Sequence, residues 1–157
     1  MYATPPRTLG LASSFGFGDR LGFATPGHLR AMRRVGGPIK AVFAQQSIRE
    51  MERTGRSAEE VMQDALSALA DADWTDEHGA DADHLKTAED ITRTAEAGFT
   101  WFTLDPSDYV DQQADDYEPA ELEQRYAALD PPPAWVESYR KKSIELPTGG
   151  EIRLDQP

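Results

Sequence analysis

The chain has 157 residues, enough for one domain or for a part of a larger protein, and 39% of them are hydrophobic. Its formal net charge of −12 argues against nucleic-acid and anionic-membrane partners, because both require basic surfaces. It has no cysteine, no long apolar run and no signal-peptide pattern, so we expect a cytoplasmic protein without disulfides, thiolate metal sites or a transmembrane helix.

The first eighteen residues are rich in glycine and proline. Gly16 and Gly18 admit two interpretations: a backbone loop that approaches a phosphate, or a simple turn. No GxGxxG or Walker pattern follows them, which favours the turn. Residues 19–23 then predict a short strand.

A helix start follows at Thr25 and Pro26. Threonine is a common N-cap, and proline fits the first helical position because its missing N–H has no partner there. The predicted helix ends at Arg34, before two glycines. His28 lies in its first turn, where a half-exposed helix residue is a better interpretation than a metal ligand.

The second predicted strand covers residues 38–44 and leads into Gln45 and Gln46. At a strand end, these amides either hydrogen-bond a polyhydroxylated ligand or cap a helix, and the sequence does not decide between the two. A short helix over residues 47–53 is predicted next.

The clearest helix begins at Ser57, where Ser57 and Glu60 have the spacing of a capping box. Apolar residues then recur at helical spacing. They are Val61, Met62, Ala65, Leu66 and Leu69. Residues 71–78 are predicted to form a solvated acidic loop.

The next strand carries the strongest chemical signal. Its alternation places Asp81, Asp83 and Leu85 on one face, with His84 and Lys86 on the other. Adjacent aspartate and histidine can hold a metal ligand beside a proton acceptor. The alternative is that this charged cluster is a solvated strand end.

A second capping-box pattern at Thr87 predicts a helix that ends at Gly98, followed by a strand over residues 99–104. Strands and helices thus alternate over residues 19–104, which predicts an α/β fold with parallel strands, either doubly wound or a β/α barrel. In both folds, ligands bind at the carboxyl ends of the strands, where the polar groups named above occur.

The composition changes at Tyr109, where an acidic linker begins. Pro119 opens a predicted helix that Pro131–Pro133 would stop, and a short helix is expected over residues 135–142. Residues 144–154 alternate around two glycines, which predicts a hairpin. We expect residues 109–157 to be a helical and hairpin insertion, or a lid over the strand ends.

Several blocks, in this order, resemble the tagaturonate epimerase family. They are SFGFGDRLG (14–22), ATPGH (24–28), QQSIRE (45–50), GADADHLKT (79–87) and TLDPSD (103–108). The resemblance implies a metal-dependent β/α (TIM-type) barrel enzyme of hexuronate catabolism that interconverts D-tagaturonate and D-fructuronate at C4. A more distant resemblance links the chain to tagatose-bisphosphate aldolase-type subunits, which have a similar Asp-His pair.

Carried over to this chain, the family pattern makes Asp83 the proton acceptor and His84 a ligand of a divalent metal cation. Epimerisation at a carbon without an activated C–H requires retro-aldol cleavage or a redox step, and a metal can polarise the carbonyl while a carboxylate moves the proton. Substrate-binding candidates are Arg20, Gln46, Lys86 and Asp105.

Family members are longer, and a full β/α barrel needs about 200 residues or more. The resemblance therefore implies that residues 1–157 form the amino-terminal part of a partial β/α barrel with a C-terminal helix and hairpin extension. Neither His28 nor His78 has a ligand-like position, so further metal ligands and a second acid or base would come from elsewhere.

Two other interpretations remain: a non-catalytic subunit for sugar-acid binding or assembly, related to the aldolase-type barrels, and an unrelated small α/β domain with solvated acidic loops. A partial barrel exposes strand edges, so we also expect self-association or a completing partner chain.

Overall fold

The computed structural model describes residues 3–129, 136–139 and 142–154. The chain divides into two compact units, residues 1–108 and residues 109–157, which we call the sheet unit and the C-terminal unit. The boundary falls where the sequence changes to an acidic linker. None of the helices in the described part of the chain has both the length and the apolar character needed to span a bilayer.

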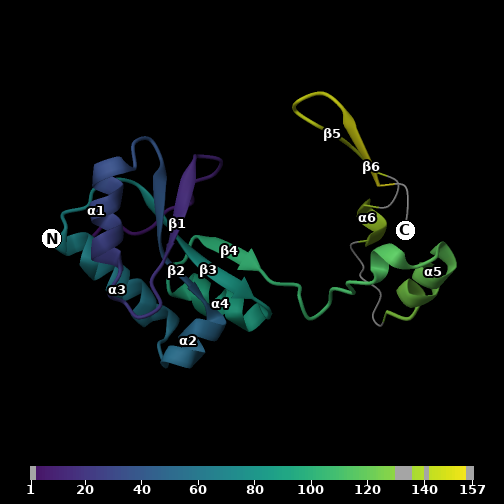
Figure 1. Cartoon of the computed structure of the whole chain (residues 1–157), viewed down its shortest axis with the longest axis horizontal. Coiled ribbons are helices and arrows are strands. Elements are labelled where there is room, and N and C mark those ends of the chain that lie inside the picture. Colours follow the sequence, from purple (N-terminus) through teal and green to yellow (C-terminus); the bar gives the residue numbers. More distant parts are fainter. Residues whose placement is uncertain (1–2, 130–135, 140–141, 155–157) are drawn as a thin grey trace. The chain divides into compact units, whose positions relative to one another are not determined.

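Four strands form the sheet of the sheet unit. They are β1 (Ser14–Gly18), β2 (Lys40–Ser47), β3 (His78–Leu85) and β4 (Trp101–Leu104). All neighbouring pairs are parallel, and the order in space is the order in the chain (Figure 1). The predicted parallel α/β arrangement is confirmed. Because β1 and β4 are not paired with each other, the four described strands make an open sheet and do not by themselves close a barrel.

Four helices connect and cover these strands. They are α1 (Thr25–Val35), α2 (Ile48–Thr54), α3 (Ala58–Asp71) and α4 (Ala88–Glu96). The capping box of α3 is present: the Ser57 hydroxyl accepts a hydrogen bond from the Glu60 N–H, and the Glu60 carboxylate accepts one from the Ser57 N–H. A second capping box joins Thr87 and Asp90 at the start of α4. Both predicted helix starts are confirmed.

The start of α1 differs from the prediction. Thr25 is the first helical residue rather than the N-cap, and the N-cap residue Ala24 makes no side-chain cap. The buried carboxylate of Asp19 instead accepts hydrogen bonds from the N–H groups of Phe23, Ala24 and Thr25. The strand predicted over residues 19–23 is wrong for the same reason, because this segment folds around Asp19 as a loop.

The glycines of β1 are neither a phosphate loop nor a turn, since both lie within the strand. A Cβ atom on Gly16 would lie 2.7 Å from Oε1 of Gln45, and one on Gly18 would lie 2.8 Å from Nη1 of Arg20. A larger residue at either position would therefore displace the end of the Gln45 or Arg20 side chain from its present place.

One face of the sheet is covered by helices. Phe43 of β2 packs with Leu29 of α1 and Leu69 of α3, and Ala80 and Ala82 of β3 belong to a second cluster under α2 and α3. Figure 1 shows α1 and α3 side by side. The opposite face of the sheet carries polar groups at the carboxyl ends of its strands.

Irregularities occur near the carboxyl ends of β2 and β3. Ala44 and His84 both have φ of +56°, and the strand register shifts at both positions. Left-handed conformations are costly for residues with a Cβ, so the surrounding structure holds these bulges in place. The bulge at His84 overturns one prediction: Leu85 lies in the core with Ala82, on the face opposite Asp81.

Short elements make up the described part of the C-terminal unit. They are the 3₁₀ turn η1 (Ala114–Asp116), α5 (Pro119–Ala127), α6 (Val136–Tyr139), β5 (Lys142–Glu145) and β6 (Glu151–Leu154). The two strands are antiparallel, which confirms the hairpin. The predicted proline stop at residues 131–133 lies outside the described residues, as do positions 135, 140 and 141 of the helix predicted over residues 135–142. The C-terminal end of that helix is wrong, because Lys142 begins β5. That this unit is an insertion or lid stays a prediction.

Candidate functional site

Two carboxylates flank the imidazole of His84 at the carboxyl end of β3. Nε2 of His84 lies 3.5 Å from Oδ2 of Asp83, and Nδ1 lies 3.4 Å from Oδ2 of Asp105. The His84 side chain is 50% exposed, whereas those of Asp83 and Asp105 are only 23% and 18% exposed. Three of the residues singled out in the sequence are therefore brought together at one strand end.

The backbone explains this convergence. In a regular strand, the side chains of Asp83 and His84 would point to opposite faces. The positive φ of His84 breaks the alternation at this residue. Asp105 follows β4, and its N–H donates a hydrogen bond to the carbonyl of Leu85 at 2.9 Å, which places it beside the end of β3.

Asp105 is held as a carboxylate. Hydrogen bonds from the side chain and the backbone N–H of Ser107 lower the pKa of Asp105, and the charges of Lys86 and His84 act in the same direction. The backbone N–H of Ser107 lies 3.0 Å from Oδ1 of Asp105. The other oxygen, Oδ2, is the one that faces His84.

Lys86 points to a different partner. Its Nζ lies 2.7 Å from Oδ1 of Asp108, and this hydrogen bond raises the pKa of the Lys86 ammonium group. Lys86 is thus a charged group with its own counter-ion at the edge of the site.

A polar network lies on the same face of the sheet, closer to its centre. Asp81 accepts hydrogen bonds from Gln45 Nε2 of β2 at 3.0 Å and from Thr103 Oγ1 of β4 at 3.1 Å. Burial raises the pKa of Asp81, which outweighs both hydrogen bonds, and the charge of Asp83 adds to the rise. Asp81 and Gln45 line a cavity of about 190 Å³ together with Trp101.

Gln46, a predicted substrate-binding residue, is buried and 2% exposed. Its Nε2 donates a hydrogen bond to the backbone carbonyl of Arg20 at 3.3 Å, and its Oε1 has no hydrogen-bond partner in the described part of the chain. Gln46 therefore supports the loop after β1, and its neighbour Gln45 is the amide that lines the cavity. The bulge at Ala44 determines which of the two amides lines the cavity, and the sequence alone does not reveal this bulge.

The other two histidines have surroundings of their own. His78 begins β3, so the strand separates it from His84 by about 20 Å. Burial lowers the pKa of His78. The ring of His28 packs 4.9 Å from the ring of Phe17. That neither histidine assists His84 stays a prediction.

The donor types around His84 suit a divalent transition metal, since imidazole and carboxylate are common ligands of such ions. The number of donors does not suffice. Among residues 3–129, 136–139 and 142–154, no group of three or more His, Asp or Glu side chains is arranged to hold a metal ion. A cation at His84 would need ligands from other residues.

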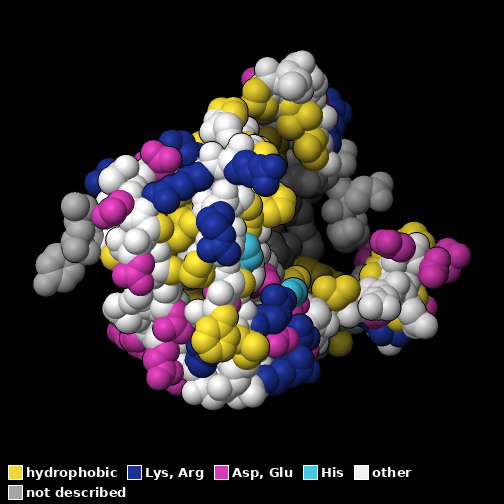
Figure 2. All heavy atoms as spheres, turned by 60° about the vertical axis from the view of Figure 1, so that its left-hand side comes forward, with side chains coloured by type: hydrophobic (Ala, Val, Ile, Leu, Met, Phe, Trp, Pro, Cys, Tyr) yellow, Lys and Arg dark blue, Asp and Glu magenta, His cyan; other side chains and the backbone are white. Residues whose placement is uncertain are grey.

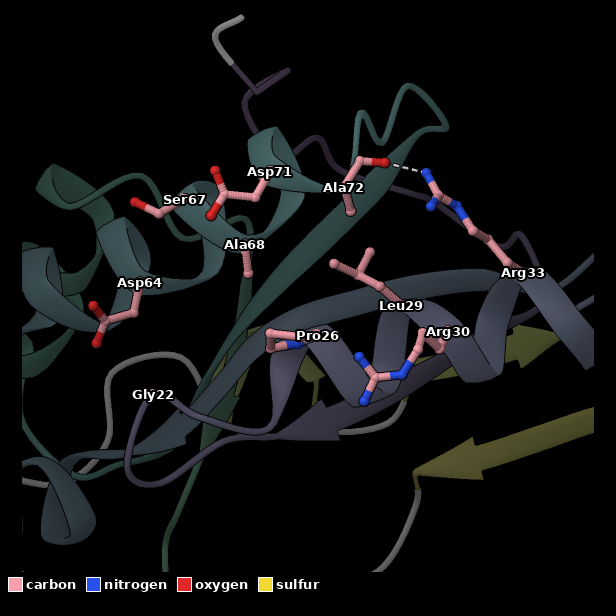
Figure 3. Close-up of a pocket in the computed structure, with 10 residues that line it drawn as sticks. All are labelled: Gly22, Pro26, Leu29, Arg30, Arg33, Asp64, Ser67, Ala68, Asp71 and Ala72. Carbon is pink, nitrogen blue, oxygen red and sulfur yellow. Dashed lines mark hydrogen bonds between the residues drawn. The ribbon is translucent and has the colours of Figure 1, made fainter.

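A separate cavity of about 400 Å³ lies between α1 and α3 (Figure 3). It is lined by Arg30 and Arg33 of α1 and by Asp64 and Asp71 of α3, and Arg33 donates a hydrogen bond to the carbonyl of Ala72 at one end. None of the strand-end residues described above lines this cavity. It belongs to the helical layer and not to the site.

The chain is similar to known proteins in both sequence and structure. Residues 1–156 match the family model described as UxaE: tagaturonate epimerase. The tagaturonate/fructuronate epimerase of Thermotoga maritima is 50% identical over 105 residues, which are 67% of this chain and 21% of that protein.

Solved structures of the fructuronate-tagaturonate epimerase UxaE from Cohnella laeviribosi also match. The native structure gives a TM-score of 0.74 at 37% identity, and a structure with one glycerol gives 0.73 at 37%. Each match covers 96% of this chain and 31% of the Cohnella chain. The chain thus spans about a fifth of the length of the curated relative and about a third of the solved chains.

Proposed function

Because this chain belongs to the tagaturonate epimerase family, we propose that it acts in the interconversion of D-tagaturonate and D-fructuronate, which differ in configuration at C4. The observation that carries the proposal is the group formed by Asp83, His84 and Asp105 at the carboxyl ends of β3 and β4. In parallel α/β folds, this end of the sheet is where substrates bind.

In this proposal, Asp83 is the proton acceptor. A 2-keto-hexuronate carries a hydroxyl at C4, β to the carbonyl. Removal of the hydroxyl proton by Asp83 allows the C3–C4 bond to break, with its electron pair moving to an enolate at C2 and C3 and an aldehyde remaining at C4. Re-addition to the other face of the aldehyde, with return of the proton, inverts C4. The reaction needs no external oxidant.

In this proposal, His84 contacts the substrate and Asp105 orients the His84 ring. Asp105 faces Nδ1 of His84 and is held as a carboxylate by Ser107, so it orients the imidazole. We propose that Nε2, the ring nitrogen on the side of Asp83, faces the substrate oxygens. Gln45, which lines the cavity with Asp81, would donate its second amide N–H to a sugar hydroxyl.

We also propose the divalent cation that the family resemblance implies, with His84 as one ligand and further ligands from residues other than those described. When bound, such an ion would supply polarisation of the substrate carbonyl. The proposed architecture is a part of a β/α barrel, in which the polar face of the sheet would be the interior. A cytoplasmic location and a completing chain or homo-oligomer stay predictions.

The first experiment is an assay of the interconversion with and without added Mn²⁺, Ni²⁺ or Zn²⁺, on the whole protein that contains these residues. We expect Asp83→Asn to lower kcat by at least about 100-fold, because it removes the proton acceptor. Asp76→Asn, which changes an exposed aspartate before β3, is the matched control and should leave kcat unchanged. Full activity of Asp83→Asn would disprove the assignment of the base.

Metal binding has its own test. Calorimetric titration of wild type and His84→Ala with each ion should show that the substitution weakens binding at least about tenfold. Equal affinity of the two proteins would remove His84 from the ligand set. This measurement does not depend on turnover, so it separates the metal proposal from the proposed reaction.

A further inference from the structure

Three arginine side chains surround one carboxylate beside the site. Glu50, in the first turn of α2, lies 3.1 Å from Arg53 Nη1, 3.9 Å from Arg49 Nε and 4.0 Å from Arg20 Nε. The Glu50 side chain is 17% exposed, whereas the three arginines are 61–64% exposed. One negative charge therefore faces three positive ones, in a chain whose net charge is −12.

The distances indicate which arginines carry the excess charge. Arg53 makes the only direct hydrogen bond to Glu50 among the three, three positions along the same helix. Arg20 and Arg49 approach the same carboxylate only at about the limit of an ion pair. Their guanidinium groups thus keep most of their donors available, and each has five N–H groups in a planar fork.

Both arginines lie at the strand ends where the proposed reaction takes place. Nη1 of Arg20 lies against Gly18, at the end of β1, 2.8 Å from where a Cβ atom on Gly18 would be. Arg49 lies two positions after Ser47, which pairs with Asp83 across β2 and β3.

Lys and Arg side chains are mixed with Asp and Glu side chains on one face of the molecule (Figure 2). One group of Lys and Arg side chains on this face lies beside a histidine, although acidic residues outnumber basic ones in the chain. Lys86 is a poorer candidate for an incoming anion, because Asp108 already neutralises it at 2.7 Å.

We infer that Arg20 and Arg49 form the subsite that binds the carboxylate of the sugar acid, and this inference rests on the proposed function. A guanidinium group binds a carboxylate through two parallel hydrogen bonds, which fixes position as well as charge. In a hexuronate, the carboxylate lies two bonds from C4, so a carboxylate held at the ends of β1 and β2 keeps C4 close to Asp83 at the end of β3. The subsite would select sugar acids over neutral ketohexoses.

The test measures KM and kcat for D-fructuronate at low and high salt in the whole protein. We expect Arg20→Gln and Arg49→Gln each to raise KM about tenfold with kcat changed by less than about twofold, because a uniform binding interaction is lost. In wild type, KM should also rise with salt, and the variants should show a weaker rise. Arg49→Lys, which keeps the charge, should recover part of the affinity.

Arg34→Gln is the matched control, since it removes the same charge from an exposed position in the last turn of α1. It should behave as wild type. Unchanged KM and salt dependence in both Arg20→Gln and Arg49→Gln would overturn the subsite while leaving the proposed function intact. Absence of any D-fructuronate turnover in wild type, at all metal conditions, would overturn both. Equal KM increases in the variants and in Arg34→Gln would also overturn the subsite.

Discussion

One carboxylate oxygen of Asp19 accepts two hydrogen bonds from Thr25, from its backbone N–H at 2.8 Å and from its hydroxyl at 2.9 Å. This contact joins the loop after β1 to the first turn of α1. It takes the place of a side-chain N-cap, because the carboxylate satisfies N–H groups that the helix leaves without partners. The loop that carries Arg20 depends on it.

We predict that Asp19→Ala lowers the free energy of unfolding by about 2 kcal/mol, since it removes a charged acceptor from several buried donors. Urea denaturation would measure this. Asp76→Ala, at an exposed position, should change stability by less than about 0.5 kcal/mol. Equal losses in the two variants would show that Asp19 contributes no more than an ordinary surface residue.

The same contact predicts a pH dependence. Burial alone would raise the pKa of Asp19, but the hydrogen bonds from Thr25, Ala24 and Phe23 outweigh it, so the pKa is lowered from its ordinary value of 3.8. A lowered folded-state pKa contributes stability above the ordinary value, and this contribution is lost as the pH falls through the folded-state pKa. The stability difference between wild type and Asp19→Ala should therefore shrink below about pH 4. A difference that grows on acidification would contradict this sign.

Gly16 allows the Gln45 side chain to reach Asp81. A Cβ atom at position 16 would lie 2.7 Å from Gln45 Oε1, so Gly16→Ala should displace the amide from the network. We expect a loss of about 1–2 kcal/mol in unfolding free energy, because the buried Asp81 loses a donor. Gly27→Ala is the control: its nearest neighbour is 3.8 Å away within a helix, and it should stabilise by about 0.5–1 kcal/mol.

Asp73 has φ of +45° just after α3 and is exposed. Glycine adopts this conformation without the cost that a Cβ imposes. We predict that Asp73→Gly raises the thermal midpoint, with a gain of about 0.5 kcal/mol. Asp71→Gly, within the last turn of the helix, should lower it by about 1 kcal/mol. Destabilisation by both changes would mean that the backbone at Asp73 carries no strain.

Asp105→Asn tests the orientation of His84. The variant keeps the size of the side chain but loses the negative charge that faces Nδ1. We expect kcat for the sugar acid to fall about 10- to 100-fold, as for other residues that orient a functional histidine. Asp108→Asn, which changes only the partner of Lys86, should have a smaller effect. If Asp108→Asn is the more damaging change, Asp105 is not the residue that positions His84.

The helices were predictable because their signals are local. The capping boxes at Ser57 and Thr87 need only residues three positions apart, and both helices begin where the pattern places them. The parallel order of β2, β3 and β4 also follows from alternation of strands and helices. β1 was misplaced because its glycines favoured a turn in the sequence, whereas in the strand they lie against the side chains of Gln45 and Arg20.

The site was only partly predictable. Asp83, His84 and Asp105 fall at strand ends in any parallel arrangement, so their proximity could be expected. The bulges at Ala44 and His84 could not, because both are non-glycine residues with positive φ that tertiary contacts impose. The different roles of Gln45 and Gln46 and the contacts of Glu50 could not be predicted from the sequence either.

The order of the strands has a consequence for how the sheet unit folds. Each strand pairs only with the strands before and after it in the chain, so every pairing closes a segment of roughly 20 to 40 residues. Such a sheet can nucleate at its central pair and grow outward in both directions. Hydrogen exchange should then be slowest for amides between β2 and β3, and the outer strands should open first under mild denaturant.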